Sequence, residues 1–443
     1  MAIAPVFAQQ KTGPGVPSDE RLTWQGITLY GVIDLGIQYD THSAPFTPYR
    51  PAASGNIIRS NAHQSVVGVT PSNMGQTRVG LQGIEPLGEK WSATFQVETF
   101  FNPQSGEIAD SLRSLTANNG KPVTEQSVGV DGSSAGQAFQ TAYVGLRSER
   151  FGSLTFGRQV TLISEGTIKY DPNYNSTAFG LLGASNTYSG GGSSEDNRVD
   201  SSVKYSVGLN DRLHVAWLYK LNGSNGSART GVQANVGGNF AGASLDGYYS
   251  KFNSSISASS LSAAQVSALP QGYDLSHSVV GTVSDNTAYA LMGLYKLDAL
   301  KLFGGYEYIK YANPKTPLNV GFIDIGGYVL AFVNNTAYTN PKISQVYWAG
   351  VRYEMAPRLE LAAAYYRVHQ SAYGIGSQTG CTSSAHSVCS GSLEAFSVDA
   401  DYRFNVHFDA YIGAMYSGVH GGLASGYLYT TNLNPTLGVR FKF

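Results

Sequence analysis

The chain offers few residues whose types and spacing could support catalysis or metal binding. None of its 8 histidines pairs with another at the spacing of metal ligands. The Ser-Gly-Gly-Gly run at 189–192 lacks the Lys-Ser/Thr continuation of a phosphate-binding loop, and no Gly-x-Ser-x-Gly motif is present. Ser392 and His369 could serve a hydrolase, but nothing in the sequence relates them. We therefore expect no enzymatic activity, no cofactor and no metal site.

The two cysteines of the chain are the exception. Cys381 and Cys389 lie close together in a segment rich in Ser, Gly and Thr, with only His386 between them as a further metal-ligand type. This set is too small for a zinc site. In an oxidising compartment the natural chemistry is a disulfide, so we predict that Cys381 and Cys389 pair and pin this loop.

Composition narrows the class of protein that could position these residues. The 443 residues include 29 Lys+Arg and 30 Asp+Glu, and charged residues make up only 13%. A net charge of −1 gives no reason to expect a nucleic-acid partner. Aromatic residues reach 12%, which argues against disorder, and no apolar run is long enough for a membrane-spanning helix. With 52 Gly and 29 Tyr, the chain is predicted to be largely β.

Strand-like segments recur along the whole chain and are separated alternately by short turns and long polar loops. The loops at 101–139, 252–285 and 310–341 are especially long. This alternation and an even strand number are typical of an outer-membrane barrel, whereas a β-sandwich would not separate its loop lengths so consistently. The sixteen predicted strands are 27–39, 78–84, 90–100, 140–148, 153–159, 197–206, 212–221, 232–236, 241–251, 286–297, 301–309, 344–354, 359–369, 392–404, 407–416 and 435–443.

Most of these segments alternate between apolar and polar residues. In the last one, Leu437, Val439 and Phe441 alternate with Gly438 and Arg440. Charge on the inner face would be too costly in a dry core, but a water-filled lumen accepts it. A closed sheet also satisfies every backbone amide within lipid. We therefore predict an all-β, 16-stranded antiparallel transmembrane β-barrel.

Five motifs in order resemble the general porins of Gram-negative bacteria, most closely the β-proteobacterial branch. The family implies outer-membrane localisation, contact with outer-membrane lipid and lipopolysaccharide, a homotrimer, and a third long loop folded into the lumen. That constriction loop would be residues 160–196. The motifs are Ile27-Thr-Leu-Tyr-Gly-Val-Ile-Asp34, Arg78-Val-Gly-Leu-Gln-Gly-Ile-Glu-Pro-Leu-Gly88, Phe151-Gly-Ser-Leu-Thr-Phe-Gly-Arg-Gln159, Asn197-Arg-Val-Asp-Ser-Ser-Val-Lys-Tyr205 and Leu437-Gly-Val-Arg-Phe-Lys-Phe443.

The resemblance implies that acids of the constriction loop face basic residues of the barrel wall. Strand parity and motif position assign Arg78 and Lys204 to this wall and Arg198 to its rim. Simple alternation puts Arg158 on the lipid side, so either a bulge turns it inward, which we favour, or it lies beyond the bilayer. The alternative for each arginine is a solvated charge at the rim. The loop acids are Glu165, Asp171, Glu195 and Asp196, which leave the loop at −3 with Lys169.

The N-terminal residues resemble the end of a secretory signal. Residues 1–8 finish in Val-Phe-Ala, a small-residue cleavage pattern, although the basic start of a signal is missing. An ordinary N-terminal segment is the alternative. We expect residues 9–26, with Pro14 and Pro17, to form a leader, and residues 27–443 to form the barrel.

These observations predict an outer-membrane porin that passes small hydrophilic solutes and ions down their gradients, with a weak preference for anions. Two alternatives stay open: a substrate-specific channel for small organic acids, and a surface barrel that acts mainly as an adhesin or receptor through its long loops. A plugged, energy-coupled transporter would need more strands and an N-terminal plug domain, for which residues 9–26 are too few.

Overall fold

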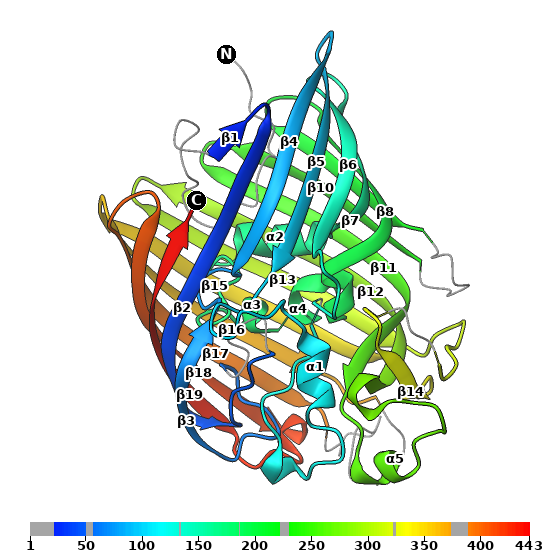
Figure 1. Cartoon of the computed structure of the whole chain (residues 1–443). Coiled ribbons are helices and arrows are strands. Elements are labelled where there is room, and N and C mark those ends of the chain that lie inside the picture. Colours follow the sequence, from blue (N-terminus) through cyan, green and yellow to red (C-terminus); the bar gives the residue numbers. More distant parts are fainter. Residues whose placement is uncertain are drawn as a thin grey trace.

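The computed structural model describes residues 22–49, 56–132, 134–185, 187–221, 230–321, 325–373 and 389–443. These residues form a closed sixteen-stranded antiparallel barrel, as the sequence predicts (Figure 1). The barrel strands are β2 (Ile27–Ser43), β3 (Gln64–Pro71) with β4 (Arg78–Gly88), β5 (Trp91–Phe100), β6 (Thr141–Ser148), β7 (Gly152–Val160), β8 (Arg198–Gly208), β9 (Leu213–Lys220), β10 (Gly231–Phe240), β11 (Ala243–Ser259), β12 (Ser278–Leu297), β13 (Leu300–Ala312), β15 (Lys342–Ala356), β16 (Leu359–Gln370), β17 (Gly391–Arg403), β18 (Phe408–Gly421) and β19 (Thr431–Lys442).

Consecutive barrel strands pair as antiparallel neighbours, and β19 pairs with β2 to close the ring. The second barrel strand is interrupted, because β3 and β4 both pair with β2 and are separated by residues 72–77. In this break the backbone N–H groups of Met74 and Gly75 donate to Asp34 Oδ2 at 2.7 and 2.8 Å. An inward-facing carboxylate therefore replaces the missing sheet partners of these amides.

Along the strands, apolar side chains on the outer face alternate with polar side chains on the inner face, as a barrel between lipid and a polar lumen requires. In β19, Leu437 and Val439 are exposed on the outer face, whereas Thr436 and Arg440 are buried on the inner face. The exposed apolar side chains can contact lipid hydrocarbon, and the polar ones gain partners from neighbouring strands and loops. Within the described ranges, no helix has the length and apolar character needed to span a membrane.

The long loops carry the short helices and pack together at one end of the barrel. Loop 2 (residues 101–139) contains α1 (Ser111–Thr116) and η2 (Val123–Glu125), and the next long loops contain α5 (Ala263–Ser267), η4 (Leu275–His277) and the strand β14 (Val329–Asn334). Figure 1 shows α1, α5 and β14 gathered at this end. Strand β14 pairs in parallel with the start of β12, so the sheet extends beyond the predicted segment 286–297. A short helix, η5 (Gly422–Ala424), follows β18.

Loop 3 (residues 160–196) folds into the barrel. It contains α2 (Leu162–Tyr170), α3 (Leu181–Ala184), α4 (Thr187–Gly190) and η3 (Ser194–Asn197). Figure 1 shows α2, α3 and α4 inside the ring of strands. Apolar residues of the loop pack on the inner face of β12–β18, because both surfaces are apolar there. The buried cluster includes Ile163, Tyr170, Leu181, Leu182, Met292, Ile309, Trp348 and Tyr366.

Residues 1–21 lie outside the described part of the chain, so the expected signal remnant stays a prediction. A short strand, β1 (Leu22–Trp24), forms a hairpin with the start of β2 inside the segment expected to be a leader. The tight turn at Gln25 and Gly26 joins these strands, and both residues have positive φ angles, 46° and 79°.

Candidate functional site

Loop 3 is fastened to the wall by a set of buried hydrogen bonds at the end of α2. Tyr366 on β16 donates to Asp171 Oδ1 at 2.6 Å, and Trp348 on β15 donates from Nε1 to the Tyr170 carbonyl at 3.0 Å. Arg352 donates to the Pro172 carbonyl at 2.6 Å. These contacts hold the loop against β15–β17 and leave open space on its other side.

Asp171 is fully buried at this attachment point. Burial raises the pKa of its carboxyl to about 6, although hydrogen bonds from Tyr366 and from the Asn175 backbone N–H oppose the rise. Asp171 therefore anchors loop 3 and does not face the basic wall residues.

The open side of loop 3 faces strands that carry the predicted basic residues. Arg78 begins β4, is 7% exposed, and its Nε lies 3.2 Å from Glu98 Oε2 on β5. Tyr30 and Gln96 extend this network, because Tyr30 OH donates to Glu98 and Gln96 Nε2 donates to Tyr30 OH. The Arg78 charge is thus held on the inner wall by a neighbouring carboxylate.

Arg198 begins β8 and lies within electrostatic range of Glu98, Arg158 and Arg78. Its guanidinium lies over the Phe100 ring, 4.7 Å from the ring centroid, and donates to Asn197 Oδ1 at 3.0 Å. Phe100 ends β5 directly opposite Arg78 in the sheet, which explains why the two arginines converge. Stacking on an aromatic face orients the flat guanidinium.

Arg158 lies at an irregularity between β7 and β8. Their register shifts between Gly157 and Gln159, and Gly157 has a φ of 136° that suits glycine. The Arg158 side chain is 12% exposed and contacts Asp200 at 2.5 Å. The sequence favours a bulge that turns Arg158 inward, and the strand has a register shift at this position.

Lys204 joins the wall directly to loop 3. Its Nζ lies 2.6 Å from Glu165 Oε1 on α2 and donates to the Val160 carbonyl at 2.9 Å. Among the predicted loop acids, Glu165 thus forms an ion pair with a predicted wall residue. This pair connects the base of the loop to β8.

The other two loop acids lie near the end of loop 3. Asp196 is buried and accepts a hydrogen bond from Ser255 Oγ of β11 at 2.7 Å. Glu195 is half-buried, and its backbone N–H donates to Ser193 Oγ at 3.3 Å. The structure therefore gathers Arg78, Arg158, Arg198 and Lys204 on one wall but distributes the acids along the loop.

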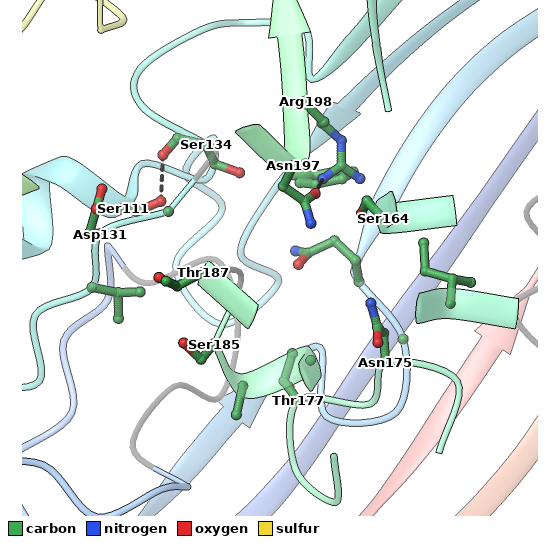
Figure 2. A pocket seen from close by; sticks show the side chains of 18 of the residues that line it. Ser111, Asp131, Ser134, Ser164, Asn175, Thr177, Ser185, Thr187, Asn197 and Arg198 are labelled. Atoms are coloured by element: carbon green, nitrogen blue, oxygen red, sulfur yellow. Dashed lines mark hydrogen bonds between the residues drawn. The ribbon is translucent and has the colours of Figure 1, made fainter. Parts of the chain in front are cut away.

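A cavity of roughly 200 Å³, here called the passage, lies between this wall and the loops (Figure 2). Arg78, Phe100 and Arg198 line it from the barrel, and Ser164, Thr177 and Thr187 line it from loop 3. Residues of loop 2 line it from the remaining side. The arrangement offers charged and hydroxyl groups to a solute that crosses the barrel.

Several lining residues were not among the sequence predictions. Arg59, Asp131 and Ser134 lie in loops, where strand parity carries no information about direction. The sequence predicts Phe100 only as the end of the strand 90–100. The length of loop 2 was a signal that this segment has a role, but its position in the lumen depends on contacts distant in sequence.

The predicted disulfide between Cys381 and Cys389 stays a prediction, because Cys381 lies outside the described residues. Cys389 is described and buried, and its carbonyl accepts from Gln370 Nε2 at 3.1 Å. Among the described residues, no group of three or more His, Cys, Asp or Glu side chains could hold a metal ion.

Comparison with known proteins agrees with the barrel fold. A family model described as Gram-negative porin matches residues 1–422. An outer membrane porin protein of Bordetella pertussis is 28% identical over 251 residues, which cover 50% of this chain and 57% of that protein. The chain therefore aligns with little more than half the length of this curated relative.

Solved structures share the fold at low identity. An anion-selective porin from Comamonas acidovorans has a TM-score of 0.60 and 15% identity, covering 94% of this chain and 99% of that one. The trimer form of OmpT from Vibrio cholerae has a TM-score of 0.53 and 11% identity, covering 94% and 99%. The chain belongs to the Gram-negative porin family, and its place is the outer membrane.

Proposed function

We propose that the protein is a non-enzymatic channel for passive diffusion of small hydrophilic solutes and ions, with a weak preference for anions. The observation that carries this proposal is the passage beside loop 3, with Arg78 and Arg198 among its lining residues. Fixed positive charge along a narrow aqueous path lowers the barrier for anions and raises it for cations. The anion-selective porin of Comamonas acidovorans, which shares the fold, is consistent with this preference.

We further propose that three copies assemble side by side in the membrane. Support comes from the trimer form of OmpT, which has the same fold, and from the apolar outer face of the barrel. The aromatic and aliphatic residues on that face can pack against lipid or against another barrel. Cross-linking of the protein in native membranes is expected to yield a trimer.

Conductance in a planar bilayer tests the channel and its selectivity together. We expect stepwise current increases, often in groups of three, because each trimer inserts as a unit. Under a KCl gradient, the reversal potential is expected to favour chloride, since K⁺ and Cl⁻ differ mainly in charge. A cation-favouring reversal potential would keep the channel and contradict the proposed role of the basic wall. A folded barrel without conductance would contradict the channel itself.

A further inference from the structure

The passage has two loop walls, and the second is unexpected. Loop 2 contributes Ser111, Asp131 and Ser134 to its lining, opposite the helices of loop 3. Figure 2 shows these residues on one side of the open centre, with Arg198 and Asn197 across from Asp131. A solute that occupies this cavity therefore lies between two loops as well as against the barrel wall.

Loop 2 is held in this position by its own contacts. Ser111 Oγ donates to the Ser134 carbonyl at 2.6 Å, and Asp131 Oδ2 accepts from the Ala258 backbone N–H at 3.1 Å. Leu112 and Leu330 belong to an apolar core that joins loop 2 to the loops at 252–285 and 310–341. When a binding site is already formed before the ligand binds, less free energy is lost in ordering its side chains, so the ligand binds more tightly.

One end of the passage is cationic. Arg78 and Arg198 line this end and converge near Phe100, whereas Arg59 lines the passage within electrostatic range of Tyr188 and Tyr427. Guanidinium groups bind carboxylates through charge-assisted hydrogen bonds, often with two bonds to one carboxylate. A carboxylate is therefore a chemical group that this end can recognise.

The rest of the lining is rich in uncharged hydrogen-bonding groups. Thr177, Ser185 and Thr187 of loop 3 surround the centre with hydroxyls, and Asn175 and Asn197 add amides (Figure 2). Such groups both donate and accept hydrogen bonds, so they can bind a ligand hydroxyl whether it acts as the donor or as the acceptor. Thr177 Oγ1 already donates to the Ser72 carbonyl at 2.6 Å, and Asn197 Nδ2 donates to Ser189 Oγ at 3.1 Å. An unsubstituted alkyl chain would therefore act mainly on the Ser185 and Thr187 hydroxyls, from which it would displace water without offering a hydrogen bond in return.

Asp131 limits what can occupy the far side. It lies in the lining away from Arg198, so a second carboxylate on the ligand would meet a carboxyl group there. Two like charges at close range repel, which disfavours a dicarboxylate relative to a monocarboxylate of the same length.

We propose that the passage between loop 2 and loop 3 is a binding site for small hydroxylated monocarboxylates of the sugar-acid type. The carboxylate lies at Arg198 and Arg78, and the ligand hydroxyls bind the hydroxyl and amide groups of loop 3. The inference rests on the proposed channel function and specifies the class of solute for which that channel has affinity.

Block of the chloride current measures this affinity. Gluconate is the probe, hexanoate has its charge without its hydroxyls, sorbitol has the hydroxyls without the charge, and glucarate adds a second carboxylate. We expect gluconate to block at concentrations at least about tenfold below those of the other three. Hexanoate lacks two or more hydrogen bonds of ordinary strength, sorbitol lacks the charge-assisted bonds to arginine, and glucarate brings a second carboxylate toward Asp131. Equal block by gluconate and hexanoate would overturn the proposal, because charge alone would then explain binding. Stronger block by glucarate would also overturn it.

Two variants locate the site. Thr187→Val is expected to weaken gluconate block about fivefold and to leave hexanoate block in place, because it removes a hydroxyl and keeps the shape. Arg198→Gln is expected to weaken both acids. Thr336→Val, at an exposed position outside the passage, is the matched control and should match the unaltered protein. A gluconate-to-hexanoate ratio unchanged by Thr187→Val would contradict the assignment.

Calorimetric titration of the folded, detergent-solubilised protein with gluconate separates this inference from the proposed function. Saturable binding of gluconate that is tighter than the binding of hexanoate would support the proposed binding site without any measurement of current. A conducting channel without such binding would overturn the inference and keep the proposed function. A gel-mobility assay of heated and unheated samples confirms that each variant is folded before it is compared.

Discussion

At the scale of residues, the basic side chains of the wall are compensated locally. Arg78 lies beside Glu98, Arg158 beside Asp200, and Lys204 beside Glu165. The electric field in the passage therefore arises from several close pairs of opposite charge. It does not arise from an acidic loop that faces a purely basic wall. Because opposite charges a few ångströms apart cancel at longer range, the expected anion preference is weak.

Reversal of charge at Arg78 should expose this balance. The variant Arg78→Glu is expected to lower the chloride-to-potassium permeability ratio at least about fivefold, which corresponds to about 1 kcal/mol of Coulomb energy at short range in water. The change would be measured as the reversal potential under a KCl gradient. Arg113→Glu, on an exposed part of α1, is the matched control. An unaltered chloride-to-potassium permeability ratio in Arg78→Glu would show that Arg78 does not contribute to ion selectivity.

Strand parity predicted the direction of these side chains only where the strand is regular. Arg78 and Lys204 lie in well-patterned segments, so alternation was informative for them. Arg158 lies at a register shift, which simple alternation cannot place. The position of Arg198 over Phe100 joins β8 to β5, and no local pattern encodes a contact between residues about a hundred positions apart.

At the scale of elements, loop 3 is a short helical insert attached mainly on one side. Its apolar helix faces pack on β12–β18, and its buried hydrogen bonds end at Tyr366, Trp348 and Arg352. The passage lies on the opposite side. The width of the passage therefore depends on how firmly this attachment holds.

Tyr366→Phe tests the attachment. The variant leaves the buried Asp171 carboxyl without one of its donors, which costs roughly 1–3 kcal/mol of local stability. We expect more frequent current fluctuations in single-channel records, because loop 3 then leaves its position more often. Tyr365→Phe, which changes the adjacent outward-facing tyrosine, should show the fluctuations of the unaltered protein. Quiet records from Tyr366→Phe would mean that Trp348 and Arg352 suffice.

The attachment of loop 2 should depend on pH through Asp131. Burial raises the pKa of this carboxyl to about 6, and the nearby Asp196 charge adds to the rise. The folded state thus holds the proton more tightly than the unfolded chain does, so the contribution of Asp131 is complete below pH 4 and is lost as pH rises through 6. Loop 2 should be attached more firmly at pH 4.5 than at pH 7.5.

Hydrogen exchange of loop 2 amides, corrected for intrinsic rates, measures this difference. Asp131→Asn should reduce it, because an amide does not titrate in this range; the remaining difference is expected from Asp110, the other loop 2 carboxyl whose pKa is raised by burial. Asp274→Asn is the control: a hydrogen bond from the Ser276 backbone N–H lowers the pKa of this exposed carboxyl to about 2, so Asp274 stays ionised throughout the window. Equal protection of loop 2 at both pH values in the unaltered protein would contradict the role of Asp131.

The sequence predicted the barrel strands better than the elements between them. Each of the sixteen expected segments overlaps one barrel strand, because alternation between apolar and polar residues continues through most of them. Strand β3 was missed, although it continues the line of β4, because residues 72–77 interrupt the pattern. Strand β14 was also missed, since its parallel pairing with β12 depends on contacts about fifty residues away and not on its own composition.

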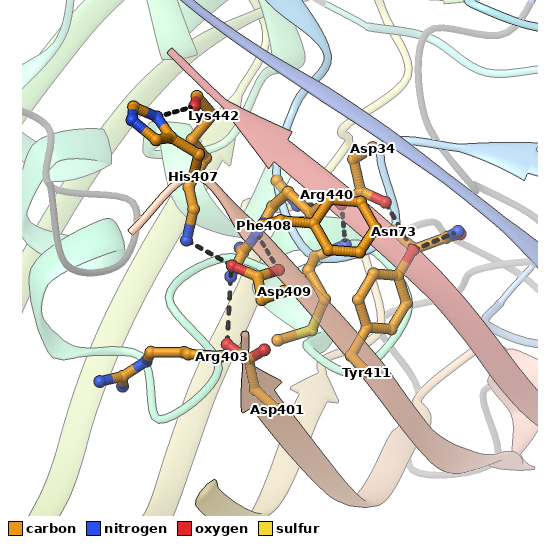
Figure 3. A network of polar contacts seen from close by, with 12 residues as sticks. Asp34, Asn73, Asp401, Arg403, His407, Phe408, Asp409, Tyr411, Arg440 and Lys442 are labelled. Carbon is orange, nitrogen blue, oxygen red and sulfur yellow. Dashed lines mark hydrogen bonds and ion pairs between the residues drawn. The ribbon is translucent and has the colours of Figure 1, made fainter. Parts of the chain in front are cut away.

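At the scale of the whole molecule, a buried charge network joins β17, β18 and β19 next to β2 (Figure 3). Arg440 contacts Asp409 at 2.9 Å and Asp401 at 3.1 Å, and Lys442 also pairs with Asp409. Tyr411 donates to Asp34 Oδ1 on β2 at 2.5 Å. This network links β17, β18 and β19 to β2, and so it spans the β19–β2 pairing that closes the barrel.

Removal of the central cation should destabilise the closed barrel. Arg440→Gln leaves two buried carboxylates without their main partner, and a broken buried ion pair typically costs about 3–5 kcal/mol. Urea unfolding in lipid vesicles, followed by tryptophan fluorescence, should show a lower midpoint. Arg358→Gln, at an exposed turn, is the control and should leave the midpoint in place. A similar midpoint for both variants would show that the network adds nothing to closure.

The pairing of β19 with β2 has a consequence for how the protein reaches its final shape. Its partners, such as Thr436 and Gln38, are separated by roughly 400 residues, whereas the other barrel strands pair with near neighbours in the chain. Hairpins form quickly because little chain entropy is lost, and a contact across such a distance comes late. The Arg440 network and the Asp34 contact are complete only when this last pairing forms, so polar side chains that would be exposed in an open sheet gain their partners at the moment of closure.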